Sequence, residues 1–156
     1  PNRRRFDLVL VNEWRRCRRK QTPLSLAMID VDNFKDYNDK FGHMGGDTAL
    51  RGIAQALSSC AHRASDLCAR FGGEEFALLI PNANITVATQ FANEVRERIS
   101  RISLTNKKTG QSIRSITTSL GVAQFRQGEP LEALVERADQ CLYEAKSAGR
   151  NCVRPA

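Results

Sequence analysis

At 156 residues, the chain has the length of one domain and enough apolar side chains to bury a core. Its hydrophobic content of 41% and charged content of 26% are ordinary for a globular protein and exclude a disordered or fibrous chain. No apolar run approaches the roughly 20 residues that span a bilayer, and no secretory signal is expected. We therefore expect one cytoplasmic domain over residues 1–156, without membrane contact of its own.

The formal net charge of +7 indicates polyanionic partners, such as nucleic acid, acidic lipid or nucleotide phosphates. The alternative is that the basic residues serve only solubility. The sequence has no RNA-recognition motif and no zinc-finger spacing, so we expect no nucleic-acid partner. Five scattered cysteines without C-x-x-C spacing are expected to stay reduced.

The first predicted element is an amphipathic helix that ends before a Thr-Pro pair. Phe6, Leu10, Trp14 and Cys17 recur at helical spacing, with arginines between them. A short apolar run follows at residues 24–29. Its length and composition predict a buried central strand.

This strand runs into Asp30-Val31-Asp32. Carboxylates at the end of a buried strand are costly unless they bind a cation or meet hydrogen-bond donors. Because side chains alternate along a strand, Asp30 and Asp32 are expected on the same side. Asp30 is therefore a candidate cation ligand, and for Asp32 the alternative is a cap on the next helix.

Residues 33–41 predict a short helix, which Gly42 and the Gly-Gly pair at 45–46 are expected to end. Asp47 is then expected to begin a second helix. His43 falls in the glycine-rich segment between them. A surface histidine is the ordinary alternative to a ligand at that position.

The central feature of the chain is a predicted β-hairpin. Residues 67–71 and 74–80 are β-prone runs, and the Gly-Gly pair at 72–73 can adopt the positive φ of a two-residue turn. The return strand opens with Glu74 and Glu75. They are candidates for a metal or acid–base site, and solvated turn residues are the alternative because short motifs often match by chance.

The remaining residues predict a helix over 87–102, a hairpin tip at 107–110 and a strand over 116–122. A last helix is expected to begin at Leu131 and to end near Gly149, and a short closing strand is expected near Cys152. This order favours an α+β fold with one mostly antiparallel sheet and helices packed on it.

Two further expectations concern single positions in this fold. Gly121, inside a predicted strand, marks a bulge or a close packing contact. If the first strand and the hairpin are neighbours, Asp30 and Glu74 converge at one edge of the sheet.

With these residues in view, the chain resembles the GGDEF family, the diguanylate cyclases that make cyclic di-GMP. Residues 72–76 are the GGEEF variant of the motif that names the family. The blocks at residues 30–47 and 146–151 match the family in order and spacing. Residues 1–4 look like the tail of its opening motif, whose first part is missing here. We therefore expect a longer protein with an N-terminal sensory or receiver-type domain, which could tether it to a membrane.

The resemblance implies a palm-like sheet, similar to that of adenylyl cyclases and polymerases. It also implies the reaction, in which two GTP molecules condense to cyclic di-GMP and release two pyrophosphates. Each domain would hold one GTP, and two domains would face each other in a transient homodimer.

By similarity, two Mg²⁺ ions, with Mn²⁺ as a substitute, are held by the carboxylates of Asp30 and Glu74 and the backbone carbonyl of Val31. Glu74 is also the candidate for removing the attacking 3′-hydroxyl proton. The roles of Glu75 and Asp32 stay open, because strand alternation sends Glu75 to the face opposite Glu74 unless the hairpin tip is kinked.

The resemblance assigns GTP binding to nine further residues: Asn33, Phe34, Lys35, Asn38, His43, Asp47, Gly73, Lys146 and Arg150. Their basic side chains balance phosphate charge, and the amides of residues 33–35 receive the terminal phosphates at a helix start. Asn38 and Asp47 read the guanine edge, and His43 has a weaker claim.

Arg63 and Asp66 form the Arg-x-x-Asp pattern that binds cyclic di-GMP for product feedback in the family. Arginine suits this role because its guanidinium holds phosphate through two hydrogen bonds and stacks on guanine. A local ion pair is the alternative. Glu94 departs from the pattern, since some members place a helper arginine there, and we expect it to weaken or rearrange the site.

Three other functions stay open. One alternative is that the domain is a catalytically weak or inactive module that binds GTP or cyclic di-GMP. Another is that it is a cyclase for a different cyclic purine dinucleotide. A DNA-binding role rests on the charge alone.

Overall fold

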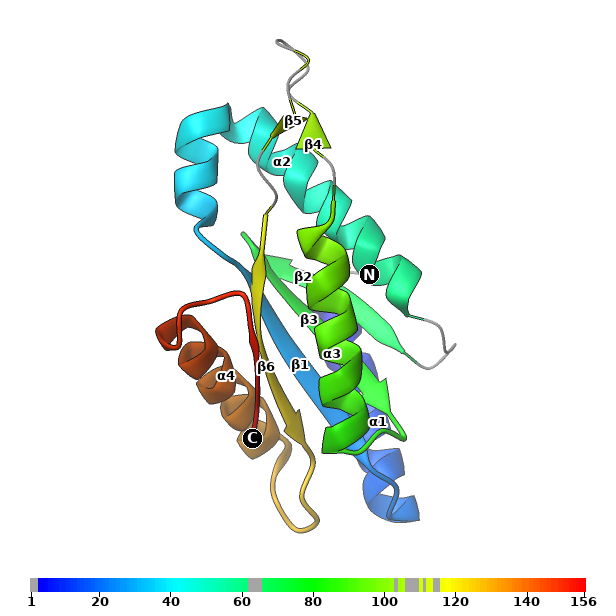
Figure 1. Cartoon of the computed structure of the whole chain (residues 1–156). Helices are drawn as coiled ribbons and strands as arrows, with labels where there is room; N and C mark the ends of the chain where they lie inside the picture. The colour runs from blue at the N-terminus through cyan, green and yellow to red at the C-terminus, as the bar shows by residue number, and fades with distance from the viewer. Residues whose placement is uncertain (1–2, 62–65, 103, 106–109, 111, 114–115) are drawn as a thin grey trace.

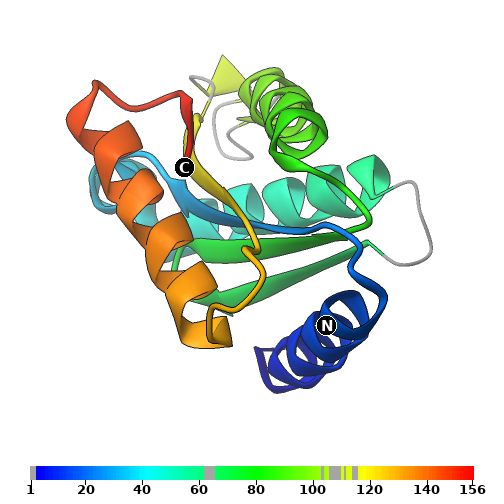
Figure 2. The same ribbon diagram turned by 90° about the horizontal axis from the view of Figure 1, so that it is seen from below.

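The structure, a computed structural model, describes residues 3–61, 66–102, 104–105, 110, 112–113 and 116–156. Helices cover both faces of a five-stranded sheet (Figures 1 and 2). The helices are α1 (Arg3–Lys20), α2 (Phe34–Cys60), α3 (Ile85–Ser100) and α4 (Leu131–Ser147). The strands of this sheet are β1 (Leu24–Val31), β2 (Leu67–Gly72), β3 (Glu75–Pro81), β6 (Thr118–Gln124) and β7 (Val153–Pro155). A separate ladder pairs β4 (Leu104–Thr105) with β5 (Ser112–Ile113).

The sheet has the strand order β2-β3-β1-β6-β7. β1 lies at the centre of the sheet, where it pairs antiparallel with β3 and with β6, and all eight of its residues are buried. Only β7 runs parallel to its neighbour among these pairings. The predicted α+β fold with a mostly antiparallel sheet is therefore confirmed, and the strand expected at residues 24–29 extends to Val31.

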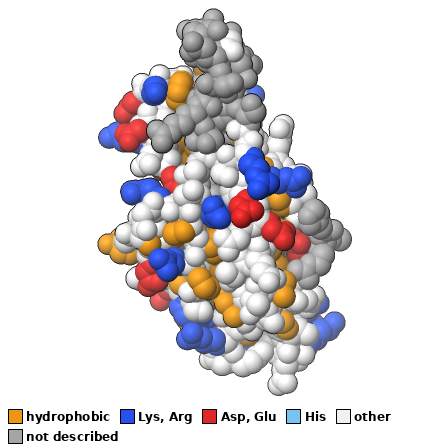
Figure 3. All heavy atoms as spheres, viewed as in Figure 1, with side chains coloured by type: hydrophobic (Ala, Val, Ile, Leu, Met, Phe, Trp, Pro, Cys, Tyr) orange, Lys and Arg blue, Asp and Glu red, His pale blue; other side chains and the backbone are white. Residues whose placement is uncertain are grey.

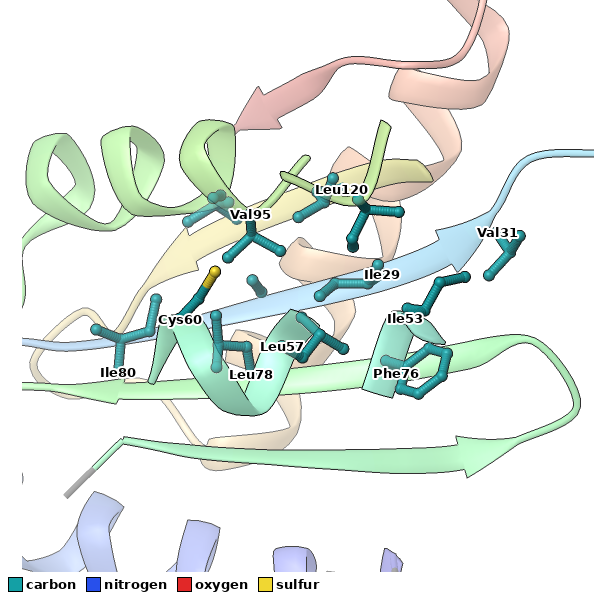
Figure 4. Close-up of a cluster of buried hydrophobic side chains, with 14 of the residues drawn as sticks. Ile29, Val31, Ile53, Leu57, Cys60, Phe76, Leu78, Ile80, Val95 and Leu120 are labelled. Carbon is teal, nitrogen blue, oxygen red and sulfur yellow. The ribbon is translucent and has the colours of Figure 1, made fainter. Parts of the chain in front are cut away.

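Each face of the sheet carries its own hydrophobic core, as the two-residue period of a strand requires. On β1, Ala27, Ile29 and Val31 face α2 and α3, in the cluster drawn in Figure 4. Leu26 and Met28 face the other way, into a cluster with residues of α1 and α4. Figure 2 shows these two helical layers on opposite sides of the sheet.

The central hairpin differs from the prediction by one residue. β2 continues through Gly72, which pairs with Glu75, so the turn residues are Gly73 and Glu74. The register shifts between Arg70 and Gly72. Both glycines have positive φ, as predicted for the turn. Glu74 therefore lies in the turn itself and not on the return strand.

α2 is kinked at Gly42, where φ is 76° and ψ is 170°, so the predicted break there is confirmed. The expected break at residues 45–46 is wrong, because these residues are helical and the second half of α2 begins before Asp47. Gly46 serves close packing instead. A Cβ atom there would lie 1.8 Å from Asn38 Oδ1, so glycine lets the two halves of α2 approach.

Gly121 marks close packing and not a bulge. A Cβ atom at this position of β6 would lie 2.2 Å from both the Ala138 carbonyl oxygen and the Leu142 amide nitrogen. α4 therefore lies directly against the backbone of β6. Among the described residues, no helix is long and apolar enough to cross a membrane. Of the predicted hairpin tip, residues 107–109 lie outside the described residues.

Candidate active site

The hairpin turn is joined to the end of the central strand. The Val31 amide donates a hydrogen bond to the Glu74 carbonyl oxygen at 3.2 Å. Asp30, the preceding residue, is opposite Glu75 on β3 and opposite Ser119 on β6. The negative charge of Glu74 also contributes to raising the pKa of Asp30. The structure thus brings Asp30 and Glu74 to one end of the sheet, as the sequence predicts.

Asp30 is buried, with an exposed fraction of 7%. Burial is the main cause that raises its pKa, the charges of Glu74 and Asp32 add to the rise, and Lys146 opposes it. Its Oδ2 forms an ion pair with Nζ of Lys146, which lies in the last turn of α4. Its Oδ1 is buried and has no hydrogen-bond partner among the described residues. A buried carboxylate oxygen without a donor is what a cation ligand leaves when no cation is bound.

These donors fit a hard divalent cation. Among the described residues, no three His, Cys, Asp or Glu side chains form a metal-binding group. The ligands predicted from the sequence are two carboxylates, Asp30 and Glu74, with the adjacent backbone carbonyl of Val31. Oxygen ligands of this kind suit Mg²⁺, which keeps several waters and takes the rest of its shell from substrate phosphates.

Asp32 is equally buried, but its oxygens are fully engaged. Its Oδ1 accepts from Ser119 Oγ at 2.6 Å, and its Oδ2 accepts from Thr117 Oγ1 at 2.7 Å and from the Asn151 amide at 2.9 Å. The alternative role as a helix cap is wrong, because Asn33 occupies the N-cap of α2. Asp32 is therefore a hydrogen-bond acceptor at the junction of three segments.

Glu75 is exposed and lies directly opposite Asp30 across the β1–β3 pair. Directly opposed residues share one face of a sheet, so Glu75 is on the face of Asp30. Because Glu74 lies in the turn, strand alternation does not separate the two glutamates. The role of Glu75 stays a prediction.

The residues predicted to bind phosphate surround this end of the sheet. Asn33 has a left-handed backbone with φ of 54°, and Phe34 and Lys35 open α2 directly after it. Lys146 lies in the last turn of α4, and Arg150 is exposed in the segment that follows. Gly73 lies in the hairpin turn. The first amides of α2 carry the partial positive charge of a helix N-terminus, which favours an anion.

The residues predicted to read guanine lie on the two halves of α2. Asn38 lies before the kink, and its buried Oδ1 has no hydrogen-bond partner among the described residues. Asp47 follows Gly46, whose Cα faces Asn38. Asp47 and His43 are exposed. The kink therefore brings Asn38 next to the start of the segment that carries Asp47.

A cavity of about 400 Å³ opens beside the first turns of α2. Of the predicted site residues, Asp32 and Asn33 line it, together with Tyr37 and Thr117. Asn38 and Asp47 do not contribute to its lining. This cavity is therefore separate from the surface where guanine is predicted to bind.

The sequence alone did not reveal the residues that support the site. Arg70 Nε donates to the Gly73 carbonyl oxygen at 2.9 Å and braces the hairpin turn. Thr117, Ser119 and Asn151 hold Asp32, although they are far from it in the sequence. The position of Arg70 just before the Gly-Gly pair could have indicated its contact with the hairpin turn. Thr117, Ser119 and Asn151 are too far from Asp32 in the sequence for any local pattern to link them.

Of the predicted feedback residues, Arg63 lies outside the described residues. Asp66 directly precedes β2 and is partly buried. Glu94 is exposed on α3.

The mixed five-stranded sheet flanked by helices has the palm-like fold of nucleotide cyclases. The chain belongs to one family of this class, since residues 1–152 match the family described as diguanylate cyclase, GGDEF domain. This confirms the resemblance seen in the sequence.

Curated relatives and solved structures agree with this assignment. Diguanylate cyclase VdcA of Vibrio cholerae is 46% identical over 132 residues, which are 85% of this chain and 39% of VdcA. The GGDEF domain of DgcB from Caulobacter crescentus, solved with c-di-GMP, has a TM-score of 0.95 and 35% identity, covering 99% of this chain and 88% of that one. The active GGEEF domain of a Vibrio cholerae diguanylate cyclase has a TM-score of 0.89 and 32% identity, covering 99% and 96%. The chain thus spans about two fifths of the length of VdcA.

Proposed function

We propose that this domain is an active diguanylate cyclase, which condenses two GTP molecules into cyclic di-GMP and releases two pyrophosphates. The observation that carries the proposal is the buried Asp30 oxygen that has no hydrogen-bond partner in the described part of the chain, beside the acidic turn of Glu74. The alternative, a catalytically inactive module that binds GTP or cyclic di-GMP, would make no cyclic product from GTP. Each copy holds one GTP, and two copies face each other to form the product.

Diguanylate cyclases are metal-dependent enzymes, and we assign two Mg²⁺ ions, replaceable by Mn²⁺, to Asp30, Glu74 and the Val31 carbonyl. When bound, the ions neutralise the triphosphate and align the reacting groups. Lys146 forms an ion pair with Asp30 at this position. Lys35, Lys146 and Arg150 would bind the phosphate oxygens of the triphosphate.

In each of the two condensation steps, the 3′-hydroxyl oxygen of one GTP forms a bond to the α-phosphorus of the other. The bond from that phosphorus to the pyrophosphate oxygen breaks, and pyrophosphate leaves. Glu74 takes the hydroxyl proton. Asn38 and Asp47 fix the guanine, because Asp47 accepts from the N1–H and amino groups that guanine offers.

The test is GTP turnover with Mg²⁺, with the products identified by mass. Because two copies must meet, the chain is assayed at high concentration and also fused to a dimeric coiled coil before residue 1. We expect cyclic di-GMP from the wild type and none from Glu74→Gln, with Glu136→Gln on α4 as the matched control. No cyclic product from the fused dimer, or full activity of Glu74→Gln, contradicts the proposal. Competition with ATP separates GTP specificity from a hybrid product.

We further propose product feedback in the groove between α2 and α3, which has a volume of about 820 Å³. Glu94 lines it, but so do Arg98, one helical turn later, and Arg101. Figure 3 shows basic and acidic side chains intermixed over this face. Arg98 therefore offers the phosphate-binding guanidinium that position 94 lacks.

Calorimetry with cyclic di-GMP tests this feedback site. Arg98→Ala is expected to weaken binding about tenfold, because a charge-assisted hydrogen bond to phosphate is lost. Arg51→Ala, an exposed arginine on α2, is the matched control. Equal affinities for Arg98→Ala and the wild type contradict a role for Arg98.

The domain is proposed to act in the cytoplasm as part of a longer protein. An N-terminal sensory or receiver-type domain then brings two copies together in response to a signal. That the domain is part of a longer protein is supported by the length of a relative, since the matched region is 39% of VdcA.

A further inference from the structure

The segment between α4 and β7 has an unusual backbone. Three successive residues, Gly149, Arg150 and Asn151, have positive φ values of 107°, 66° and 45°. We call residues 149–151 the C-terminal turn. Glycine adopts such values freely, but arginine rarely does. A run of this kind persists only where the surrounding structure holds it.

Contacts from three directions hold the C-terminal turn. The Asn151 amide donates to Asp32 Oδ2 at 2.9 Å. The Asn151 side-chain oxygen accepts from Arg96 Nη1 of α3 at 3.0 Å. The Arg150 amide donates to the Ala145 carbonyl oxygen at 3.0 Å and ties the turn to the end of α4. The turn is therefore fixed to β1, to α3 and to α4.

Asp32 is more buried than Arg96, the other side chain that holds the turn. It is buried, and its two oxygens also accept the hydroxyl groups of Thr117 and Ser119 at 2.7 and 2.6 Å. With three donors on one carboxylate, the side chain has a single well-determined position. Thr117 and Ser119 lie on the chain that enters β6, so Asp32 joins β1, β6 and the C-terminal turn.

The C-terminal turn and the end of α4 are tied to the two acids at the end of β1. Lys146 pairs with Asp30, and Asn151 donates to Asp32. Arg150 lies between these two attachment points. We propose that Asp32 is a positioning residue for GTP, because it holds the C-terminal turn so that Arg150 and Lys146 meet the triphosphate. This inference rests on the proposed function, and Arg96 is the second positioning residue.

Binding measurements separate this role from a general effect of charge. The probe is a GTP analogue with a methylene bridge between the α- and β-phosphates, with Mg²⁺, measured by calorimetry. By charge alone, removing a carboxylate near a triphosphate strengthens binding. We expect the opposite from Asp32→Asn, a loss of about tenfold. The affinity for guanosine is expected to stay within about twofold, because guanosine carries no phosphate.

The matched control is Asp139→Asn, which removes the same charge from an exposed position on α4. It is expected to leave both affinities unchanged. A stronger or unchanged affinity of Asp32→Asn for the analogue overturns the inference. So does an equal loss of guanosine affinity, because that result indicates general damage to the fold.

A double-mutant cycle tests whether Asp32 acts through Arg150. Arg150→Ala alone is expected to weaken the analogue about tenfold, as one charge-assisted contact to phosphate is lost. In the Arg150→Ala background, Asp32→Asn is expected to reduce the affinity for the analogue by a further factor of about three or less, because the group that Asp32 positions is already missing. Fully additive losses overturn the inference.

If Asp32→Asn does not fold, Arg96→Met removes the other anchor of Asn151 from a largely buried side chain on α3. We expect the affinity for the analogue to fall about threefold and the affinity for guanosine to stay unchanged. Equal affinity of Arg96→Met and wild type for the analogue then overturns the inference. A wild type that binds the analogue but makes no cyclic product refutes the proposed function and leaves the positioning role standing.

Discussion

Asp30 and Asp32 lie two residues apart at the end of β1, and both have an exposed fraction of 7%, yet their surroundings differ. Asp32 accepts three hydrogen bonds from neutral donors. Asp30 has one lysine and one oxygen without a partner among the described residues. Burial alone therefore does not identify a ligand. We propose that the unsatisfied oxygen of Asp30 is the one available to a cation, whereas the oxygens of Asp32 belong to the scaffold.

The largest expected effect separates the two carboxylates by activity. Asp30→Asn is expected to reduce turnover of GTP about a thousandfold, since several kcal/mol of metal stabilisation are lost. Steady-state release of pyrophosphate measures this. Asp139→Asn serves as the control. If Asp30→Asn retains more than a tenth of wild-type turnover, Asp30 is not a metal ligand.

A change at Gly121 sharpens the comparison without touching either carboxylate. Gly121→Ala is expected to destabilise the fold by about 3 kcal/mol, because the new Cβ meets the backbone of α4. It also moves Lys146 away from Asp30, so turnover falls as well. Chemical denaturation measures the stability. An unchanged unfolding midpoint would show that α4 is free to shift, and that Lys146 is not held by this contact.

Asp32→Asn is expected to cost about 2 kcal/mol of folding stability, because an amide leaves at least one of the three donors without an acceptor. Thermal unfolding measures this loss. Ser119→Ala removes one of the same hydrogen bonds and is expected to lose less. If Asp32→Asn is as stable as the wild type, the carboxylate is not the scaffold residue that its contacts indicate.

The smallest expected effect is the response of stability to pH at Asp30. Burial raises the pKa of Asp30 above its value in the unfolded chain, so ionisation of Asp30 opposes folding. Its contribution to stability is present below the unfolded pKa and is lost as the pH rises through the folded pKa. Asp30→Asn removes this loss, so the variant is expected to melt at or slightly above the wild-type temperature at neutral pH. A clearly lower melting temperature contradicts the assignment of a net burial cost to Asp30.

Local sequence patterns predicted the elements that need only local rules. The apolar run at residues 24–29 predicted the central strand, and the Gly-Gly pair before Glu74 predicted the hairpin. The convergence of Asp30 and Glu74 followed from placing these two elements side by side. The exact turn, Gly73-Glu74, did not follow, because a register shift near Arg70 depends on pairing that local propensity does not determine.

The partners of Asp32 were out of reach for a different reason. Ser119 and Asn151 are 87 and 119 residues away, and any serine or asparagine has the same local preferences. Gly46 was misread as a helix break for the same reason. Position 46 requires glycine because the side chain of Asn38, on the other half of α2, lies against it. Only the folded chain brings these two residues together.

The central claim is that Asp30 and Glu74 together hold the cation that binds the triphosphate of GTP. The most direct measurement is a crystal structure of this chain with the methylene-bridged GTP analogue and Mn²⁺, whose anomalous signal locates the ions. We expect Mn²⁺ within coordinating distance of the Asp30 and Glu74 carboxylates and of the phosphates. Nucleotide bound with its cations away from both carboxylates, or with Lys146 still paired to Asp30, would contradict the account.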